Sequence, residues 1–138
     1  TLRSMAAQII SQEAPIRDDV VARQIARAHG FARTGANIRD RILRIVRDFP
    51  ATDESTGRFL WNESGPRETI DFREALSEED KRAIDEISLS ELRGLIRQNT
   101  DLLRQSDPAV AIARAIGLGR LAQSARERIA EAIDLERD

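Results

Sequence analysis

The sequence predicts a mainly α fold, in which a winged helix-turn-helix with a small β-hairpin wing precedes a helical half containing a second, degenerate helix-turn-helix. The first observation behind this prediction is an internal repeat. Residues 24–46 reappear without a gap as residues 111–133, and 9 of the 23 positions are identical. Both copies read as helix, glycine-stopped turn, helix, which is typical of a helix-turn-helix. The second observation is a strand-like stretch at residues 57–72, after the first copy.

Three helices are predicted ahead of this stretch. Apolar residues at helical spacing indicate a helix over residues 2–12, and Pro15 separates it from the next element. A second helix is expected over residues 18–28, because Gly30 stands where a helix stop is expected. The third helix ends at Pro50, and its apolar face is formed by Ile38, Ile42, Ile45 and Phe49.

Residues 57–72 change from helical to strand-like character. The segments 57–61 and 68–72 are aromatic or β-branched, and the turn-rich segment 62–67 separates them. We therefore expect a β-hairpin over 57–72, which would form the wing. Phe59 and Trp61 are expected to anchor this wing to the body of the domain rather than to stack on bases.

The second half is predicted to be helical. Residues 77–80 resemble a capping box, which would open a helix extending to Ile87, and residues 90–96 supply another helix. Asp107 and Pro108 form a helix start that leads to Ile116, and the last helix covers about residues 121–135. We divide the chain into a winged helix-turn-helix at 1–76 and a helical half at 77–138, and expect the two to pack as one unit.

Composition narrows the classes of function. The 138 residues include no cysteine, which removes disulfides, thiolate chemistry and most zinc sites. No run of 18 apolar residues occurs, so we expect no membrane partner. The chain begins at Thr1 without a signal-peptide pattern, and we expect a cytoplasmic segment of a longer protein.

Catalytic motifs are hard to find in the sequence. The single histidine, His29, has no obvious orienting partner, and the acidic residues at 78–80 are those favoured at the start of a helix. No nucleotide-binding loop, nucleophile elbow or dinucleotide fingerprint occurs. We therefore expect no enzyme activity, no cofactor and no metal.

The charges are unevenly distributed. The formal net charge is −2, and the basic side chains are 21 arginines and one lysine. Residues 1–50 carry nine arginines against five acids, whereas residues 51–100 carry seven basic groups against twelve acids. A basic first third in an acidic chain is compatible with one basic face.

The third helix is the candidate site, because Asn37, Arg41 and Arg44 share one face of it, opposite the apolar face. A helix that follows a tight turn and exposes Arg and Asn has the residues that a major-groove reader needs. Arg33 precedes the helix. In the second copy a glutamate replaces Arg44, so we place DNA contact in the first copy. The full candidate set is Arg33, Asn37, Arg41, Arg44 and, from the predicted wing, Arg58 and Arg67.

The same residues allow a second interpretation. Arginines on a solvated helix face also occur without nucleic acid, and winged helices also serve as protein-docking modules. The alternative function is therefore a module for protein–protein or intramolecular docking, with a homodimer among its forms.

A resemblance to a known family indicates the kind of parent protein in which either function would operate. The segments 13–16 and 21–39 resemble the pattern E-G-P-I followed by R-(I/V)-A-x-A-x-G-x-x-R-x-G-x-R-I. This pattern is that of an uncharacterised domain near the C-terminus of large bacterial proteins that join a superfamily I helicase-like ATPase to a Vsr-type nuclease domain. The clear match covers about residues 2–61. Ala14, Gln24 and Asn37 depart from the pattern.

The resemblance implies an accessory module of a helicase–nuclease that is used in DNA restriction or defence. The ATPase and nuclease chemistry would lie in other parts of the parent protein, whose domains would be partners of this module, together with duplex or junction DNA. The resemblance supplies no known binding residues. The Asn at position 37 would indicate altered contacts if the helix reads nucleic acid.

Overall fold

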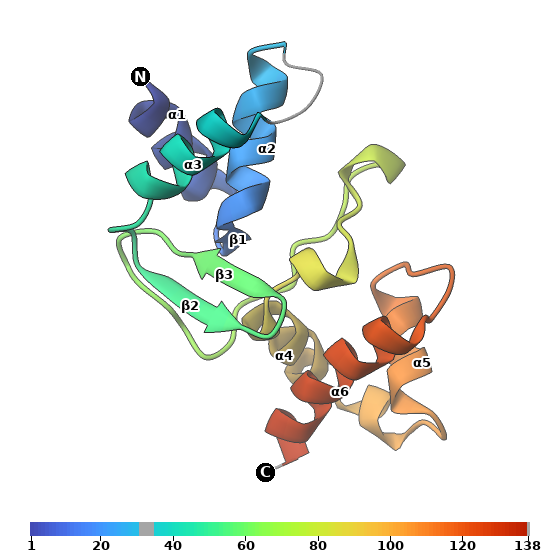
Figure 1. Ribbon diagram of the computed structural model, residues 1–138. Helices are drawn as coiled ribbons and strands as arrows, with labels where there is room; N and C mark the ends of the chain where they lie inside the picture. Colours follow the sequence, from blue (N-terminus) through green and yellow to red (C-terminus); the bar gives the residue numbers. More distant parts are fainter. Residues whose placement is uncertain (31–34, 138) are drawn as a thin grey trace. The chain divides into compact units, whose positions relative to one another are not determined.

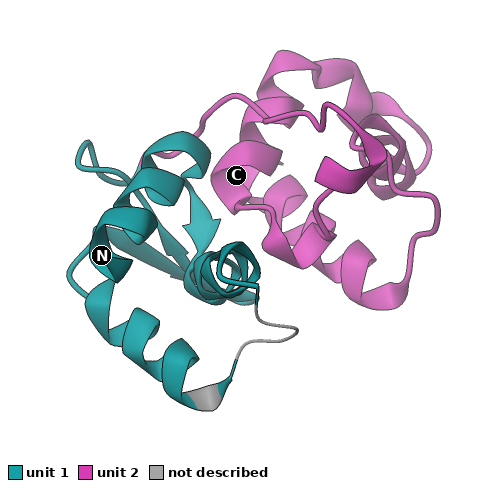
Figure 2. Ribbon diagram, turned by 90° about the horizontal axis from the view of Figure 1, so that it is seen from above, with its two compact units in different colours: residues 1–66 teal, residues 67–138 magenta. Residues whose placement is uncertain are grey.

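The computed structural model describes residues 1–30 and 35–137, and these confirm the predicted fold class. The chain is mainly helical, with a small three-stranded antiparallel sheet that includes a β-hairpin wing (Figure 1). It divides into two compact units, Thr1–Pro66 and Arg67–Asp138 (Figure 2). Residues 67–76, which the sequence analysis placed in the first part, belong to the second unit.

Within residues 1–30 and 35–66, the first unit contains three helices and three strands in the order helix, strand, helix, helix, strand, strand. Its helices group together on one side, with the sheet beside them (Figure 1). The central strand of the sheet pairs with both neighbours, and the strand order is β1-β3-β2. The elements are α1 (Leu2–Glu13), β1 (Ile16–Arg17), α2 (Asp18–Ala28), α3 (Ala36–Ile45), β2 (Ala51–Glu54) and β3 (Gly57–Leu60).

Local sequence explains where these helices begin and end. The Thr1 side chain accepts a hydrogen bond from the backbone N–H of Ser4 and caps α1. Asp18 and Asp19 lie in the first turn of α2, where the helix dipole favours carboxylates. Gly30 follows α2 with φ 78°, a left-handed conformation that glycine adopts without a steric penalty.

The predicted position of the wing was wrong. The hairpin consists of β2 and β3 and ends at Leu60, whereas residues 68–72 form no strand. β2 has the sequence Ala-Thr-Asp-Glu, without an apolar alternation, because it is an edge strand that needs only its ladder to β3. The apolar pattern of residues 68–72 serves another purpose, since this segment lies against α4 (Leu89–Gln98) in the second unit.

Hydrogen bonds from Arg17 connect the hairpin turn to the start of α2 within the first unit. Its guanidinium donates to both carboxylate oxygens of Asp19, at 2.8 and 2.7 Å, and to the backbone carbonyl of Thr56 in the hairpin turn, at 3.4 Å. A Cβ on Gly57 would lie 2.9 Å from Cδ of Arg17, so the turn approaches this side chain closely. The pKa of Asp19 is lowered by the hydrogen bonds from Arg17, against the opposing effect of burial.

The second unit is built from three helices and short 3₁₀ turns. The helices are α4, α5 (Pro108–Ala115) and α6 (Gln123–Arg137), and the 3₁₀ turns are η1 (Glu78–Asp80), η2 (Ile84–Glu86) and η3 (Thr100–Arg104). The helix predicted from residue 77 to Ile87 was therefore wrong. Most of residues 73–83 are exposed, so little apolar area is buried there to stabilise a helix beyond single turns.

The capping box of this unit lies eleven residues later than the predicted one. The Ser88 hydroxyl accepts from the backbone N–H of Glu91 at 3.2 Å, and the Glu91 carboxylate accepts from the backbone N–H of Ser88 at 3.4 Å. Glu91 is buried, and Arg82 donates to both of its carboxylate oxygens, at 2.9 and 2.8 Å. A buried carboxylate is tolerated here because hydrogen bonds satisfy both oxygens.

The segment that follows the first unit crosses α4 in close contact. The backbone N–H of Ile70 donates to the carbonyl of Ser90 at 3.2 Å, and the Ser90 hydroxyl donates to the carbonyl of Arg67 at 2.7 Å. A Cβ on Gly94 would lie only 1.8 Å from the carbonyl oxygen of Ile70. Glycine at position 94 is therefore what allows the two backbones to meet.

We predict that Gly94→Ala destabilises the protein by about 1–3 kcal/mol or more, because the added methyl group displaces backbone rather than a flexible side chain. Denaturant unfolding followed by circular dichroism measures this effect. Gly119→Ala is the matched control, since no atom lies within 4 Å of a Cβ built there. Equal stability of the two variants would contradict the close contact between residues 70 and 94.

Candidate functional site

The candidate site is the exposed face of α3. The opposite face packs into the core of the first unit, where Ile42 and Val46 are buried together with Ile25 of α2. Burial of these side chains fixes the rotation of α3, so that the remaining face meets water. Asn37, Arg41 and Arg44 are exposed, as the spacing predicted.

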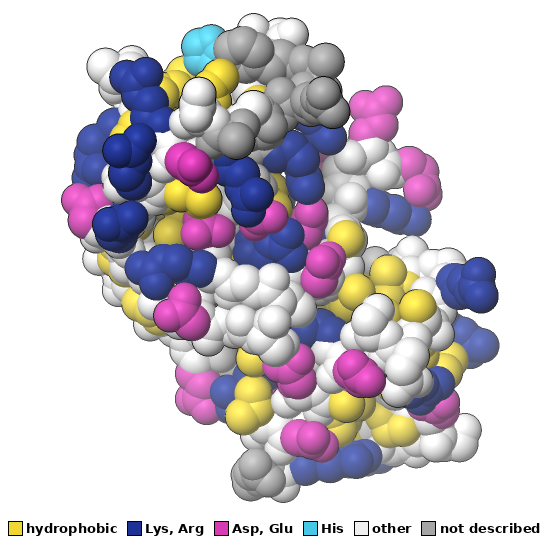
Figure 3. All heavy atoms as spheres, viewed as in Figure 1, with side chains coloured by type: hydrophobic (Ala, Val, Ile, Leu, Met, Phe, Trp, Pro, Cys, Tyr) yellow, Lys and Arg dark blue, Asp and Glu magenta, His cyan; other side chains and the backbone are white. Residues whose placement is uncertain are grey.

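The arginines on this face are not used in ion pairs within the described part of the chain. Among those residues, Arg41 has no acidic partner, and Arg44 makes only a long contact of 3.5 Å from Nε to the carbonyl oxygen of Asp40. Arg47, one turn further, is also exposed. In the space-filling view, several basic side chains lie over α3 and its surroundings, with single acidic side chains between them (Figure 3).

Asp40 and Asp48 are the acidic residues that the sequence places next to these arginines, and Arg3 pairs with Asp48. The two nitrogens of the Arg3 guanidinium donate to the two carboxylate oxygens of Asp48, each at 3.2 Å. These hydrogen bonds lower the pKa of Asp48, against a small opposing effect of burial. Asp48 therefore stays ionised and engaged with α1 rather than with α3.

The wing contributes one of the two arginines assigned to it. Arg58 lies on β3, is partly exposed, forms an ion pair of 3.3 Å with Asp53 and donates to the carbonyl of Arg47 at 3.4 Å. It therefore lies beside the C-terminal end of α3. Trp61 is buried, and its indole N–H donates to the hydroxyl of Thr52 at 3.1 Å, so this ring supports the hairpin.

Two predicted site residues are not placed with α3. Arg33 lies outside the described residues. Arg67 is not part of the wing, because the hairpin ends at Leu60 and Arg67 is the first residue of the second unit.

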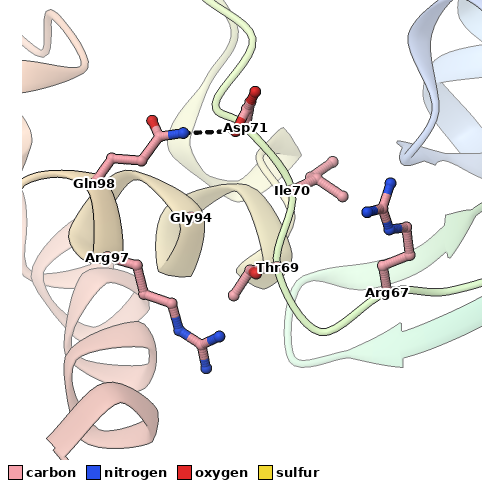
Figure 4. Close-up of a pocket in the computed structure, with 7 residues that line it drawn as sticks. All are labelled: Arg67, Thr69, Ile70, Asp71, Gly94, Arg97 and Gln98. Atoms are coloured by element: carbon pink, nitrogen blue, oxygen red, sulfur yellow. Dashed lines mark hydrogen bonds between the residues drawn. The ribbon is translucent and has the colours of Figure 1, made fainter.

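Arg67 lines a hollow in the second unit. The segment containing Thr69 and Ile70 runs across α4 at Gly94 there (Figure 4). The side chain of Gln98 closes one side by donating to Asp71 at 2.6 Å. The lining side chains belong to this crossing segment and to α4, and the hydrogen bonds given above hold the two together.

The second repeat copy has the same helix stop as the first. α2 ends at Ala28 and α5 at the equivalent Ala115, and the glycines that follow each have a positive φ, 78° at Gly30 and 84° at Gly117. α3 and α6 also begin at equivalent positions, 36 and 123. Ile112 and Ile129 are buried in the second core, as their counterparts are in the first.

The two copies differ in how they use the arginine of the second helix. Arg128, the counterpart of Arg41, is only 2% exposed and donates to the carbonyl of Ile87 at 2.9 Å. It also contacts Glu131, at 3.4 Å, which stands at the position of Arg44. The arginine at this position is therefore buried in the second copy and exposed to solvent in the first.

Several other arginines of the second unit are paired with acids. Arg93 and Arg97 each donate to Glu136 at 2.6 Å, which joins α4 to the last turns of α6. Both also reach Glu68, at 2.8 and 3.2 Å. Arg126 binds both carboxylate oxygens of Asp107, the residue that caps α5. These arginines stabilise the fold and are less available to a ligand than those of α3.

Sequence reasoning missed one residue of the site, Arg3. It contacts Asp48 and the carbonyl of Ile45 from a position more than forty residues earlier in the chain. The packing of α1 against α3 creates this contact, and no local pattern marks it.

Within residues 1–30 and 35–137, no group of three His, Asp or Glu side chains could hold a metal ion. No helix in the described part of the chain is long and apolar enough to cross a membrane.

Comparison with known proteins gives one finding. Residues 1–40 are similar to a family whose model is described as "Protein of unknown function (DUF3320)". The match covers α1, β1, α2 and the start of α3, and supports a domain of unknown function there. No curated protein and no solved structure matched the chain.

We predict that Glu136→Gln destabilises the protein by about 1–3 kcal/mol at neutral pH, because Arg93 and Arg97 lose their shared charged partner. Burial alone would raise the pKa of Glu136, but the hydrogen bonds from the two arginines outweigh it, and the pKa lies below its ordinary value of 4.5. A carboxyl group with a lowered pKa in the folded state stabilises that state at a pH above its unfolded pKa.

The difference in unfolding free energy between wild type and Glu136→Gln should therefore be constant above about pH 4.5 and shrink as the pH falls through the lowered value. Urea unfolding at several pH values measures it. Glu127→Gln, an exposed position on the same helix, serves as the control. A difference that grows on acidification would contradict the assigned ion pairs.

Proposed function

We propose that the first unit is a non-catalytic DNA-binding module that contacts duplex DNA through the exposed face of α3, with the wing beside it. The single observation that carries this proposal is the state of the α3 arginines. Arg41 and Arg44 are exposed and have no acidic side chain as a partner among the described residues, while Asp48, one of the two nearby acids, is held by Arg3. Cations without an internal partner are available to phosphates.

The side chains on this face suit the major groove of B-DNA, which is wide enough to admit an α-helix. A guanidinium binds O6 and N7 of guanine with two hydrogen bonds, and the Asn amide pairs in the same way with N6 and N7 of adenine. Asn37, Arg41 and Arg44 provide these groups along one face. Arg47 and Arg58, at the C-terminal end of the helix, would reach the sugar–phosphate backbone.

The contrast between the repeat copies supports placing DNA in the first unit. The second copy has the same glycine helix stop, yet its equivalent arginine is buried and a glutamate replaces the next one. A helix-turn-helix backbone is therefore retained there without the cationic face. In this proposal the second unit stabilises the module or contacts protein.

The resemblance described above suggests the setting. In a large helicase–nuclease, such a module would hold duplex or junction DNA near the ATPase and nuclease domains of the parent protein. The module itself would supply binding energy and orientation, and the parent would supply the chemistry.

One observation favours docking to a protein as the second candidate function. Leu76 is 95% exposed, in a segment of the second unit that is otherwise polar. A single exposed leucine is not an apolar patch, but it is the side chain of this segment through which a protein partner would be contacted, and association through it would depend little on salt.

We predict that wild-type protein binds a labelled duplex and that the logarithm of its binding constant falls with the logarithm of salt concentration. With three to five phosphate contacts, the slope should be about −3 to −4.5. Arg41→Glu combined with Arg44→Glu should weaken binding by roughly a hundredfold or more, because two charged contacts are replaced by repulsion. Fluorescence anisotropy measures both quantities.

The matched control is Arg114→Glu combined with Arg137→Glu, which makes the same change in net charge at two exposed positions of the second unit. This control should bind within about threefold of wild type if α3 is the contact surface. Thermal unfolding checks that both double variants are folded. Equal loss of affinity in the two, or unchanged affinity in the α3 variant, would refute the proposed placement of DNA.

A further inference from the structure

We propose that Arg3 of α1 is a positioning residue for the DNA-binding face: it screens the negative charge at the C-terminal end of α3 and thereby makes that end acceptable to phosphate. This inference rests on the proposed function. It adds to the site a residue from another helix, more than forty positions away in the sequence.

The C-terminal end of a helix is unfavourable for an anion. The last carbonyl groups lack partners within the helix and give that end a partial negative charge. In α3 this end is at Ile45, and the carboxylate of Asp48 lies just beyond it. Without compensation, both would repel a phosphate that approaches Arg44 or Arg47.

Arg3 meets both negative groups at once. One guanidinium nitrogen donates to the carbonyl oxygen of Ile45 at 2.9 Å and to the Asp48 carboxylate at 3.2 Å, and the other donates to the second carboxylate oxygen at 3.2 Å. The guanidinium carbon also lies 5.1 Å from the centre of the Phe49 ring, over its face. These contacts hold the cation in one place.

Three other arginines lie near the C-terminal end of α3 and could bind phosphate there. Arg44 and Arg47 are exposed at this end of α3, and Arg58 reaches the carbonyl of Arg47 from the wing. Loss of Arg3 would leave Asp48 next to these cations, where it would compete with phosphate for them. The carboxyl group of Asp48 is charged in the neutral range with or without Arg3, because the ordinary pKa of an aspartate lies far below it.

An exposed ion pair of this kind contributes little to stability, which separates its structural role from its effect on binding. Arg3→Gln should therefore weaken duplex binding about three- to tenfold at low salt, with only a small change in thermal stability. Arg3→Lys should bind within about twofold of wild type, because it keeps a cation near Asp48.

The decisive experiment is a set of anisotropy titrations with the full 138-residue chain and one labelled duplex. Arg3→Gln combined with Asp48→Asn should return to within about twofold of wild type, because the exposed carboxylate is then removed. Arg3→Gln combined with Glu63→Gln makes the same change in net charge at an exposed acid outside this contact, and should stay weak. This pattern would establish the screening role.

Three outcomes would overturn the inference while the proposed function stands. Wild-type affinity in Arg3→Gln would show that Asp48 has no effect. A double variant with Asp48→Asn that stays weak would show that Arg3 does not act by screening the Asp48 carboxylate, the larger of the two negative charges that it contacts. Equal recovery with Glu63→Gln would reduce the effect to net charge. If wild-type protein does not bind the duplex, the proposed function fails, and this inference fails with it.

Discussion

Burial of one apolar face of α3 is the constraint on which the rest of the first unit depends. Ile42 and Val46 enter the same core as Ile25 of α2, and the sheet adds Leu60. Because side chains project from a helix at fixed angles around its axis, and because the buried side is close-packed, fixing this face also fixes the direction of the opposite side chains. The exposure of Arg41 and Arg44 follows from packing that does not involve them.

The second unit shows that the apolar pattern of the motif can be retained while the charges on the same helix change. Equivalent isoleucines are buried, and the glycine stop has the same left-handed backbone, yet Arg128 is buried where Arg41 is exposed. Glu131 then partners Arg128 from the position of Arg44. Retaining the apolar pattern preserves the helices and the glycine stop of the motif, while the changes from Arg44 to Glu131 and from Arg47 to Asp134 alter which side chains remain available for a partner.

The arginines consequently have two uses in this chain. Arg93 and Arg97 both donate to Glu136 and thereby connect α4 to α6, so each already has an acidic partner within the fold. Arg41 and Arg44 of α3 have no such partner among the described residues, and Asp48, one of the two carboxylates near them in the sequence, is bound by Arg3 of α1. A high arginine content alone therefore does not indicate nucleic-acid binding; the pairing of each guanidinium decides what it can bind.

The sequence by itself determined the helices of the repeat, their glycine stops and the buried and exposed faces of α3, because these depend on periodicity and on local backbone preference. The wing could not be placed correctly from the sequence, because the edge strand β2 has no apolar alternation to reveal it. The strand-like apolar residues near Ile70 instead belong to the segment that packs on α4 at Gly94. The sequence also could not reveal that Arg3 reaches Asp48. Tertiary packing decided these contacts, because they join segments that are distant in the chain and whose side chains carry no signal of one another.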